Sequence, residues 1–277
     1  MKITKFYLEK SLGQNKICLN LNEISLIIGK NGSGKTTILK ALEALYHQDW
    51  EFFQKIQAYR CEMQIDSGDT FAYNGDTKEF AWFESENSLH NWSRMPFFLT
   101  IGTKSLQAET FLSLSQEIQN EALQKYFLTQ SIYDSFLKEA ELEERKKLYK
   151  KIKNIPQIWF HLKIFIDTCD NFLKKRIYGF TDIAFPSEKK TSDDLPCCPF
   201  MHLSEGEQRI LYLFSQLYLK RNTKVLLVLD EPENHLHIQW QEQLIEAIRT
   251  IHQKVQILFA THSPEIVGHW SDYVISL

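Results

Sequence analysis

Several features that define whole classes of protein are missing from this sequence. Its 32 basic and 35 acidic residues give a formal net charge of −3, so no global positive field attracts the chain to nucleic acid, and such a contact would need a local patch. Its longest apolar runs, such as residues 225–229, are too short to cross a bilayer. The sequence also has no internal repeat and no low-complexity segment.

The composition and the cysteines exclude further classes of protein. Hydrophobic residues make up 43% of the chain and charged residues 24%, a balance that excludes disordered, collagen-like and rod-like coiled-coil chains. The five cysteines are odd in number and irregularly spaced, as expected of reduced thiols. The first residues lack the apolar core of a signal peptide. We therefore expect a soluble, cytoplasmic protein of one large domain or one domain with an insertion.

The hydrophobic pattern predicts an α/β chain interrupted by a helical segment. Apolar runs predict strands at residues 2–8, 18–21, 23–28, 97–101, 225–229 and 255–260. Helical spacing predicts helices at residues 36–47, 205–221 and 238–252, and turn signals at 66–69 and 74–76 predict hairpins within 59–83. Residues 105–176 contain one proline and no glycine, which indicates a helical insertion, and residues 178–199 have the composition of a loop. The long apolar strands favour a parallel sheet covered on both faces.

The sequence GKNGSGKT at residues 29–36 matches the phosphate-binding pattern G-x-x-x-x-G-K-S/T, between an expected strand and an expected helix. Its glycines let successive backbone N–H groups face phosphate oxygens, and the helix N-terminus adds positive potential. Lys35 would reach the β- and γ-phosphates of ATP, and the Thr36 hydroxyl would bind Mg²⁺. The predicted nucleotide-binding residues are Asn31, Gly32, Ser33, Gly34, Lys35, Thr36 and Thr37.

Two carboxylates follow the apolar run at residues 225–229. Asp230 and Glu231 stand at the carboxyl end of an expected buried strand, where doubly wound sheets bind ligands. Asp230 would hold Mg²⁺ together with Thr36, and Glu231 is placed to orient or deprotonate an attacking water. The phosphate loop upstream favours this interpretation over an ordinary strand-end turn.

Two further motifs lie on either side of this strand. The sequence LSEGEQ at residues 203–208 places Ser204 and Gly206 at the start of a helix; taken alone, it is a capping box. His262, in the sequence THSP, ends the last long apolar strand. A lone histidine is usually structural, but at the end of a neighbouring parallel strand it can reach a γ-phosphate.

In this order, the four motifs resemble the ATP-binding-cassette (ABC) ATPase superfamily. The opening KITKFYLEKSLGQNKICLNLNEISLIIGKNGSGKTT, the sequence DEPENHLH at residues 230–237 and THSP at residues 261–264 are similar to its soluble branch, which includes SMC, RecF and OLD-like ATPases. The resemblance covers about residues 1–50 and 198–277. It implies Mg²⁺-dependent ATP hydrolysis by a homodimer closed around two ATP molecules, with Glu231 and His262 as catalytic residues.

The resemblance also assigns a role in trans to the LSEGEQ motif. Ser204 and Gly206 of one subunit would contact the γ-phosphate held by Lys35 of the other, and a helix N-terminus is suited to that role. The family's glutamine that senses Mg²⁺ has Gln107 as its candidate here. Ile238 stands where the branch usually has proline.

We therefore predict an α/β P-loop NTPase of the ABC-ATPase head type, with a mixed or parallel sheet as its core, an antiparallel β subdomain and a helical insertion. One head would span residues 1–277, with an N-terminal lobe (1–104), the insertion (105–178) and a signature and switch lobe (196–277). Because the chain ends soon after the switch strand, we expect it to lack the nuclease domain of OLD-like proteins.

Small stand-alone ATPases of the AAA family in bacterial anti-phage systems are also similar, which predicts control of a separate effector such as a nuclease, in defence or DNA maintenance. An ATP-clamped scaffold with little turnover is an alternative, and a transporter cassette is disfavoured by the Ser-Pro that follows His262. Basic residues at 145–153 and 174–176 would contact DNA or RNA, or form a solvated face. No membrane contact is expected.

Three smaller features have alternative interpretations. Cys197 and Cys198 with His202 suggest a metal, but adjacent cysteines lack zinc-site spacing. His235 and His237 fit a dimer-interface loop better than a metal site. The pair Phe6–Tyr7 fits a first-strand core better than a face for adenine.

Overall fold

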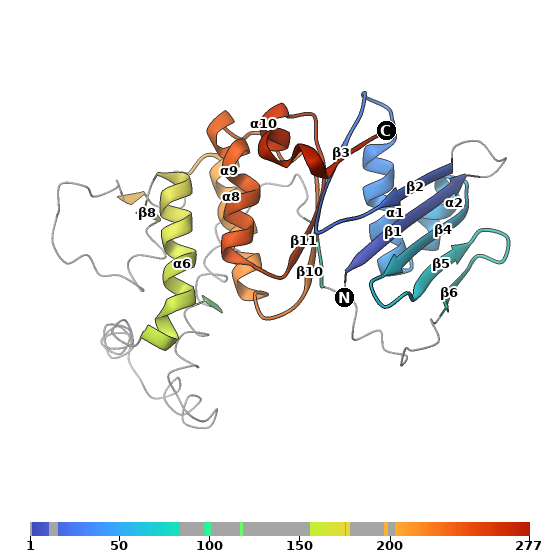
Figure 1. The fold of residues 1–277 in the computed structure, drawn as a ribbon, viewed down its shortest axis with the longest axis horizontal. Helices are drawn as coiled ribbons and strands as arrows, with labels where there is room; N and C mark the ends of the chain where they lie inside the picture. Colours follow the sequence, from blue (N-terminus) through green and yellow to red (C-terminus); the bar gives the residue numbers. More distant parts are fainter. Residues whose placement is uncertain are drawn as a thin grey trace, which may run out of the picture. The chain divides into compact units, whose positions relative to one another are not determined.

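A computed structural model describes residues 2–10, 16–83, 97–100, 117–118, 156–174, 176–177, 197–198 and 203–277 (Figure 1). The chain divides into two compact units. The first unit comprises Met1–Gly102, Asn222–Glu242 and Lys254–Leu277, and the second comprises Thr103–Arg221 and Gln243–Gln253.

The first unit contains a five-stranded antiparallel sheet in the order β2-β1-β4-β5-β6. Its strands are β1 (Ile3–Lys10), β2 (Lys16–Asn20), β4 (Ala58–Ile65), β5 (Thr70–Asn74) and β6 (Glu79–Phe83). The predicted hairpins are present as β4-β5-β6. They extend the sheet begun by β1 and β2, because β1 pairs with β4 and places Phe6 opposite Met63. That pairing buries the apolar sides of both strands on one face.

The second sheet of this unit is parallel, as predicted, with the order β12-β3-β11-β10-β7. Its strands are β3 (Ile24–Ile28), β7 (Phe97–Thr100), β10 (Val225–Asp230), β11 (Val255–Ala260) and β12 (Val274–Ser276). Strands β10 and β11 are buried along almost their whole length, which explains their continuous apolar sequences. The predicted α/β class with parallel and antiparallel sheets is confirmed.

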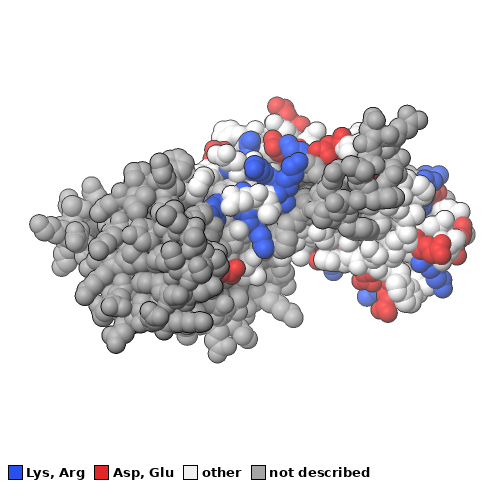
Figure 2. Space-filling model, turned by 90° about the horizontal axis from the view of Figure 1, so that it is seen from below, with Lys and Arg blue, Asp and Glu red and all other residues white. Residues whose placement is uncertain are grey.

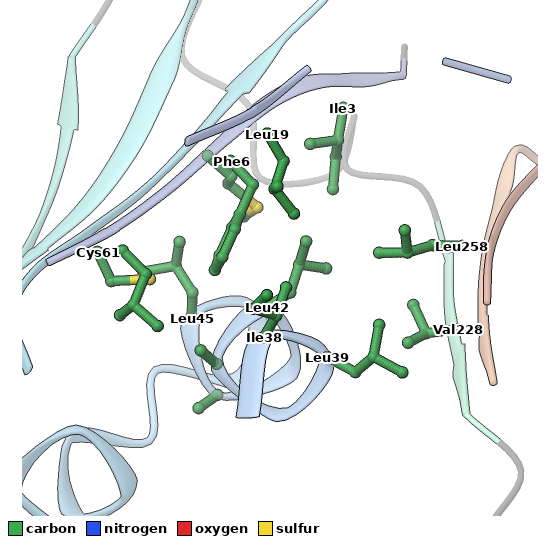
Figure 3. Close-up of a cluster of buried hydrophobic side chains, with 14 of the residues drawn as sticks. Ile3, Phe6, Leu19, Ile38, Leu39, Leu42, Leu45, Cys61, Val228 and Leu258 are labelled. Carbon is green, nitrogen blue, oxygen red and sulfur yellow. The ribbon is translucent and has the colours of Figure 1, made fainter. Parts of the chain in front are cut away.

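Helix α1 (Lys35–His47) lies between the two sheets and shares one hydrophobic core with them. In Figure 3, Leu39 points towards Val228 and Leu258 of the parallel sheet, while Leu45 lies on the side of Phe6 and Cys61. Burial raises the pKa of the Cys61 thiol well above its usual range, so this cysteine acts as a neutral core residue. The helix that follows the phosphate loop is therefore anchored on both sides.

A buried glutamine joins the two sheets. Gln256 of β11 donates from Nε2 to the carbonyl oxygens of Ile3 (2.7 Å) and Asn22 (2.9 Å), and its Oε1 accepts from the Ile3 N–H at 2.9 Å. These bonds satisfy backbone groups at the sheet margins that burial would otherwise leave unpaired.

Four short elements of the first unit were not predicted. They are α2 (Trp50–Lys55), α10 (Pro264–Val267), the 3₁₀ helix η3 (Gly268–Tyr273) and β12. Each has six residues or fewer, too few to establish a hydrophobic period. Helix α2 is set by its cap, since the Asp49 carboxylate accepts from the Phe52 N–H at 3.1 Å and Phe53 is buried.

The described part of the second unit consists mainly of helices. Helix α6 (Pro156–Leu173) packs against α8 (Glu205–Leu219), with ring centroids 4.8 Å apart for Phe165 and Tyr218 and 5.2 Å apart for Phe172 and Phe214. Helix α9 (Ile238–Ile251) runs from the first unit into the second, and both α8 and α9 match their predictions. Strand β8 (Arg176–Ile177) pairs with β9 (Cys197–Cys198). Most of the predicted insertion lies outside the described residues.

Charges of both signs are mixed on the surface at the antiparallel-sheet end of the first unit (Figure 2, right). In the antiparallel sheet, Lys16 pairs with Glu9 at 3.1 Å, and Arg60 pairs with Glu62. This mixture agrees with the small net charge of the whole chain. Among the described helices, none combines the length and apolar character that crossing a membrane requires.

Candidate nucleotide-binding and catalytic site

The predicted phosphate loop connects β3 to α1, and its shape depends on two glycines. Gly32 and Gly34 have φ angles of +81° and +98°, a left-handed region that costs other residues about 1–2 kcal/mol. Gly34 is also the N-cap of α1, and within the described part of the chain no side chain caps this helix. The N–H groups of the first helical turn have no intrahelical acceptor, so they are available to an anion.

Lys35 lies inside this loop with only 6% of its surface exposed. Its Nζ donates to the carbonyl oxygens of Gly29 (2.9 Å) and Lys30 (3.2 Å). The Ser33 hydroxyl oxygen is buried and has no hydrogen-bond partner among the described atoms. A buried ammonium, an unpaired hydroxyl and an uncapped helix N-terminus together fit a phosphate group, so the loop is suited to ATP.

The remaining loop residues are more accessible. Asn31 and Thr36 are exposed, and Thr37 is half-buried. Strand β12 borders the loop, since the Leu277 N–H donates to the Ile28 carbonyl at 3.0 Å. A Cβ added at Gly29 would come within 2.7 Å of Ser33 Oγ and 3.2 Å of the Leu277 carbonyl oxygen. The first glycine of the motif is therefore fixed by close packing.

Asp230 and Glu231 lie where the sequence predicts them, at the carboxyl end of β10, and both are exposed. Glu231 has a φ of +49°, unusual for a residue with a side chain and a mark of a locally constrained backbone. Its N–H donates to the Ala260 carbonyl at 2.8 Å, and its Oε2 accepts from Asn234 Nδ2 at 2.9 Å. The carboxylate is thus held by its own turn.

The oxygen donors of Thr36 and Asp230 could share a magnesium ion. Strand β11 lies between β3 and β10 in the parallel sheet, so the loops that follow β3 and β10 meet at one sheet edge. The described residues hold no group of three or more His, Cys, Asp or Glu suited to a metal. Mg²⁺ at a nucleotide site needs only one or two protein oxygens beside phosphates and waters, so these residues fit it.

The predicted switch residue His262 follows β11, and its side chain is exposed. Its backbone is held by Glu233, whose Oε1 accepts from the His262 N–H at 2.6 Å and whose Oε2 accepts from Thr261 Oγ1 at 2.8 Å. Sequence reasoning included Glu233 in the DEPENHLH motif but gave it no role. Its bonding partners are 28 and 29 residues away in the chain, beyond any local pattern.

A second set of hydrogen bonds supports the first. Ser263 Oγ donates to Gln241 Oε1 at 2.6 Å, and Gln241 Nε2 donates to the Leu236 carbonyl at 2.9 Å. The Ser263 hydroxyl also caps α10 by accepting from the Ile266 N–H at 3.1 Å. The segment after β10 and the segment after β11 are therefore joined by side chains from both.

The LSEGEQ motif opens α8 in the second unit. Ser204 is the exposed N-cap of the helix, and the capping box predicted from the sequence is present. The Glu207 N–H donates to Ser204 Oγ at 3.4 Å, and the Ser204 N–H donates to Glu207 Oε2 at 2.8 Å. Gly206 is buried in the first turn. The contact of Ser204 and Gly206 with a partner's nucleotide stays a prediction.

Other candidates can be placed individually. Phe6 is completely buried in the core, whereas Tyr7 faces the other side of the sheet and donates to Glu9 Oε2 at 2.7 Å; this hydrogen bond raises the pKa of the Tyr7 hydroxyl. His235 and His237 are exposed in the turn after β10. Several candidates lie outside the described residues, namely Gln107, His202, Lys175 and basic residues 145–153. The side chains of Arg176, Cys197 and Cys198 are also not described, whereas Lys174 is exposed.

A phosphate loop follows β3 at a helix N-terminus, two carboxylates stand at the end of β10, and a histidine follows β11, the strand between β3 and β10. Together these features define a P-loop ATPase head. The chain belongs to the AAA ATPase domain family, whose model matches residues 1–195. A second model, described as "AAA domain, putative AbiEii toxin, Type IV TA system", matches residues 129–268.

The chain is also similar to two proteins named Septu protein PtuA. The protein from Bacillus thuringiensis is 28% identical over 297 residues, which cover 92% of this chain and 70% of that protein. The protein from Bacillus mycoides is 22% identical over 286 residues, which cover 94% of this chain and 38% of that protein. The chain thus spans well under half of the second relative.

Among solved structures, the fold is similar to SMC heads. The SMC head domain from Thermotoga maritima matches with a TM-score of 0.53 at 13% identity, over 100% of this chain and 94% of that chain. An Smc head with an extended coiled coil, bound to the C-terminal domain of ScpA and derived from Pyrococcus furiosus, matches with a TM-score of 0.51 at 13% identity, over 99% of this chain and 93% of that chain. The predicted ABC-ATPase head fold is confirmed.

Proposed function

We propose that this protein hydrolyses ATP with Mg²⁺ and uses the closing and opening of a homodimer to control a separate effector. The observation that carries the proposal is the phosphate loop, which combines an uncapped helix N-terminus, a buried Lys35 and a Ser33 hydroxyl with no partner among the described atoms. The whole chain, residues 1–277, acts as a single head in this proposal.

Each residue has a defined task in the proposed reaction. The loop N–H groups and Lys35 bind the phosphates, and Lys35 exchanges its present carbonyl acceptors for phosphate oxygens. Thr36 and Asp230 hold Mg²⁺, which neutralises phosphate charge when bound. Glu231 orients the attacking water and accepts its proton, while His262 donates a hydrogen bond to the γ-phosphate.

The proposed dimer places the second half of each site on the partner subunit. Ser204 is exposed at the N-terminus of a 15-residue helix, and such an end attracts anions through its free N–H groups and dipole. Ser204 and Gly206 of one subunit would therefore bind the γ-phosphate carried by the other. Closure on two ATP molecules follows, because neither subunit has a complete site.

The comparisons with known proteins support the effector and the biological setting of the proposal. Similarity to two Septu proteins named PtuA, and to a family model that names a putative toxin of a type IV toxin–antitoxin system, supports a role in bacterial defence. The Pyrococcus furiosus Smc head is bound to a domain of ScpA, which supports control of a second protein by a head of this fold. We propose a cytoplasmic complex with a nuclease as the effector, with DNA or RNA contact through residues 145–153 and 174–176.

Replacing the proposed base separates binding from chemistry. We expect Glu231→Gln to bind ATP with unchanged affinity but to hydrolyse it about 10²–10⁴-fold more slowly, because the amide cannot accept the proton of the water. Phosphate release and binding of a fluorescent ATP analogue would measure the two effects, with and without the co-expressed effector. Equal turnover in wild type and variant would refute the assignment of Glu231.

Mixing two inactive variants tests the composite site. Lys35→Ala removes the nucleotide half of a site, and Ser204→Arg blocks the half supplied in trans. Each variant alone should be inactive, whereas heterodimers should recover up to one working site, because each chain supplies what the other lacks. If heterodimers confirmed by native mass spectrometry stay inactive, the signature does not act in trans.

A further inference from the structure

Glu233 stands in the turn between β10 and α9, two residues after the proposed base, and it is half-buried. Both of its carboxylate oxygens are used, one by the Thr261 hydroxyl and one by the His262 N–H. No step of the proposed reaction requires this residue. Its bonds nevertheless end on the residue that is expected to contact the γ-phosphate.

A carboxylate suits the two donors that Glu233 faces. Each of its two oxygens accepts one hydrogen bond, whereas a neutral amide has a single acceptor oxygen. Charge-assisted hydrogen bonds are shorter and stronger than neutral ones, and the bond to the His262 N–H measures 2.6 Å.

The backbone on both sides of His262 is fixed, although its exposed ring has no hydrogen bond to any residue that the structure describes. The Thr261 N–H donates to the Ile27 carbonyl at 3.0 Å, which ties the preceding residue to β3. The Ser263 N–H donates to Thr261 Oγ1 at 3.0 Å, and Thr261 is completely buried. With the Glu233 bond, three consecutive N–H groups are held, so the imidazole depends on this backbone for its position.

We propose that Glu233 is a positioning residue that holds the His262 backbone and couples it to the turn at residues 231–237. Asn234, the next residue, holds the Glu231 carboxylate at 2.9 Å, so the base and the histidine are both held from one turn. A displacement of this turn therefore moves both catalytic groups together. This inference rests on the proposed ATPase function, because it concerns how fast the bound ATP reacts.

The test compares Glu233→Ala, Glu233→Gln and the control Glu242→Ala, which removes an exposed carboxylate from α9. We expect Glu233→Ala to lower the single-turnover rate of ATP hydrolysis by about tenfold or more, since a small misplacement of a catalytic group has effects of that size. Nucleotide affinity should stay within about twofold, because the loop at residues 29–36 is untouched. The control should match wild type in both measurements.

Glu233→Gln distinguishes positioning from a loss of structure. Its amide oxygen can accept from the His262 N–H while its NH₂ group donates to the Thr261 hydroxyl, so we expect at least half of the lost rate to return. The His262 N–H provides a readout that is independent of activity. Hydrogen exchange followed by NMR should show it protected in wild type and in Glu233→Gln, and at least tenfold faster in Glu233→Ala.

The outcomes separate this inference from the function on which it rests. If wild type hydrolyses ATP and Glu233→Ala does so within twofold of it, or if the His262 amide exchanges equally fast in both, the positioning role is wrong and the ATPase stands. If wild type hydrolyses no ATP even with excess enzyme and effector, the proposed function fails and this inference fails with it.

Discussion

The phosphate loop and the turn at residues 231–237 both leave parallel strands at the same sheet edge, yet they are built differently. The loop places glycine at its left-handed positions, Gly32 and Gly34, whereas the turn places Glu231 (φ +49°) and His235 (φ +67°) there. Glycine adopts this conformation without strain. The turn is instead held by hydrogen bonds to Ala260, Thr261 and His262.

Because of this difference, the two regions should be sensitive to substitutions in different parts of the chain. The loop's left-handed positions are glycines within eight consecutive residues, so single substitutions in the turn should leave nucleotide binding largely intact. The turn's shape depends on bonds to residues 260–262, at the end of β11 and just after it, and the two side-chain bonds span 28 and 29 residues of the chain. The turn therefore responds to whatever displaces the end of that strand. We therefore expect affinity for ATP to be a property of the loop and the hydrolysis rate to be a property of the turn.

The largest effect should come from removing the ammonium in the loop. Lys35→Ala should weaken ATP binding by about a hundredfold or more, because charge-assisted hydrogen bonds to phosphate are lost. The turn should not respond, so protection of the His262 amide should be unchanged. Isothermal titration calorimetry would measure the ATP affinity, and hydrogen exchange would measure the protection of the His262 amide. If Lys35→Ala binds ATP as tightly as wild type, ATP affinity is not a property of the loop.

An intermediate effect should follow from adding a single methyl group to the loop. Gly34→Ala places a side chain at φ +98°, at a cost of about 1–2 kcal/mol, which should weaken ATP binding by about tenfold. Gly68→Ala is the matched control, since Gly68 has φ +93° in a hairpin turn of the antiparallel sheet. The control should lower the melting temperature without changing ATP affinity.

The smallest effect should come from the amide that holds the base. Asn234→Ala removes one exposed hydrogen bond to Glu231, and we expect turnover to fall by about threefold to fivefold. Affinity for ATP should not change. Steady-state kinetics at saturating ATP would measure this, and an increase in KM with an unchanged kcat would show that the turn also contributes to binding.

The same comparison explains what the sequence could predict. The loop, its helix and strands β10 and β11 were predictable because their patterns are local: glycine spacing, helical period and long apolar runs. The capping box at Ser204 was predictable for the same reason. Strand β12 was not, since three partly exposed residues carry no pattern, and Glu233 was not, since its role depends on bonds to a strand far along the chain.

The Gln256 side chain has a consequence for synthesis on the ribosome. It bonds to Ile3, 253 residues earlier in the chain, and Leu277 closes the sheet beside the phosphate loop through Ile28. Contacts of such large sequence separation form late, because closing so long a loop of chain costs entropy. The motif at residues 29–36 is therefore translated well before Gln256 and Leu277, which complete its surroundings. A nascent chain stalled before residue 255 should carry the complete loop sequence and bind no nucleotide.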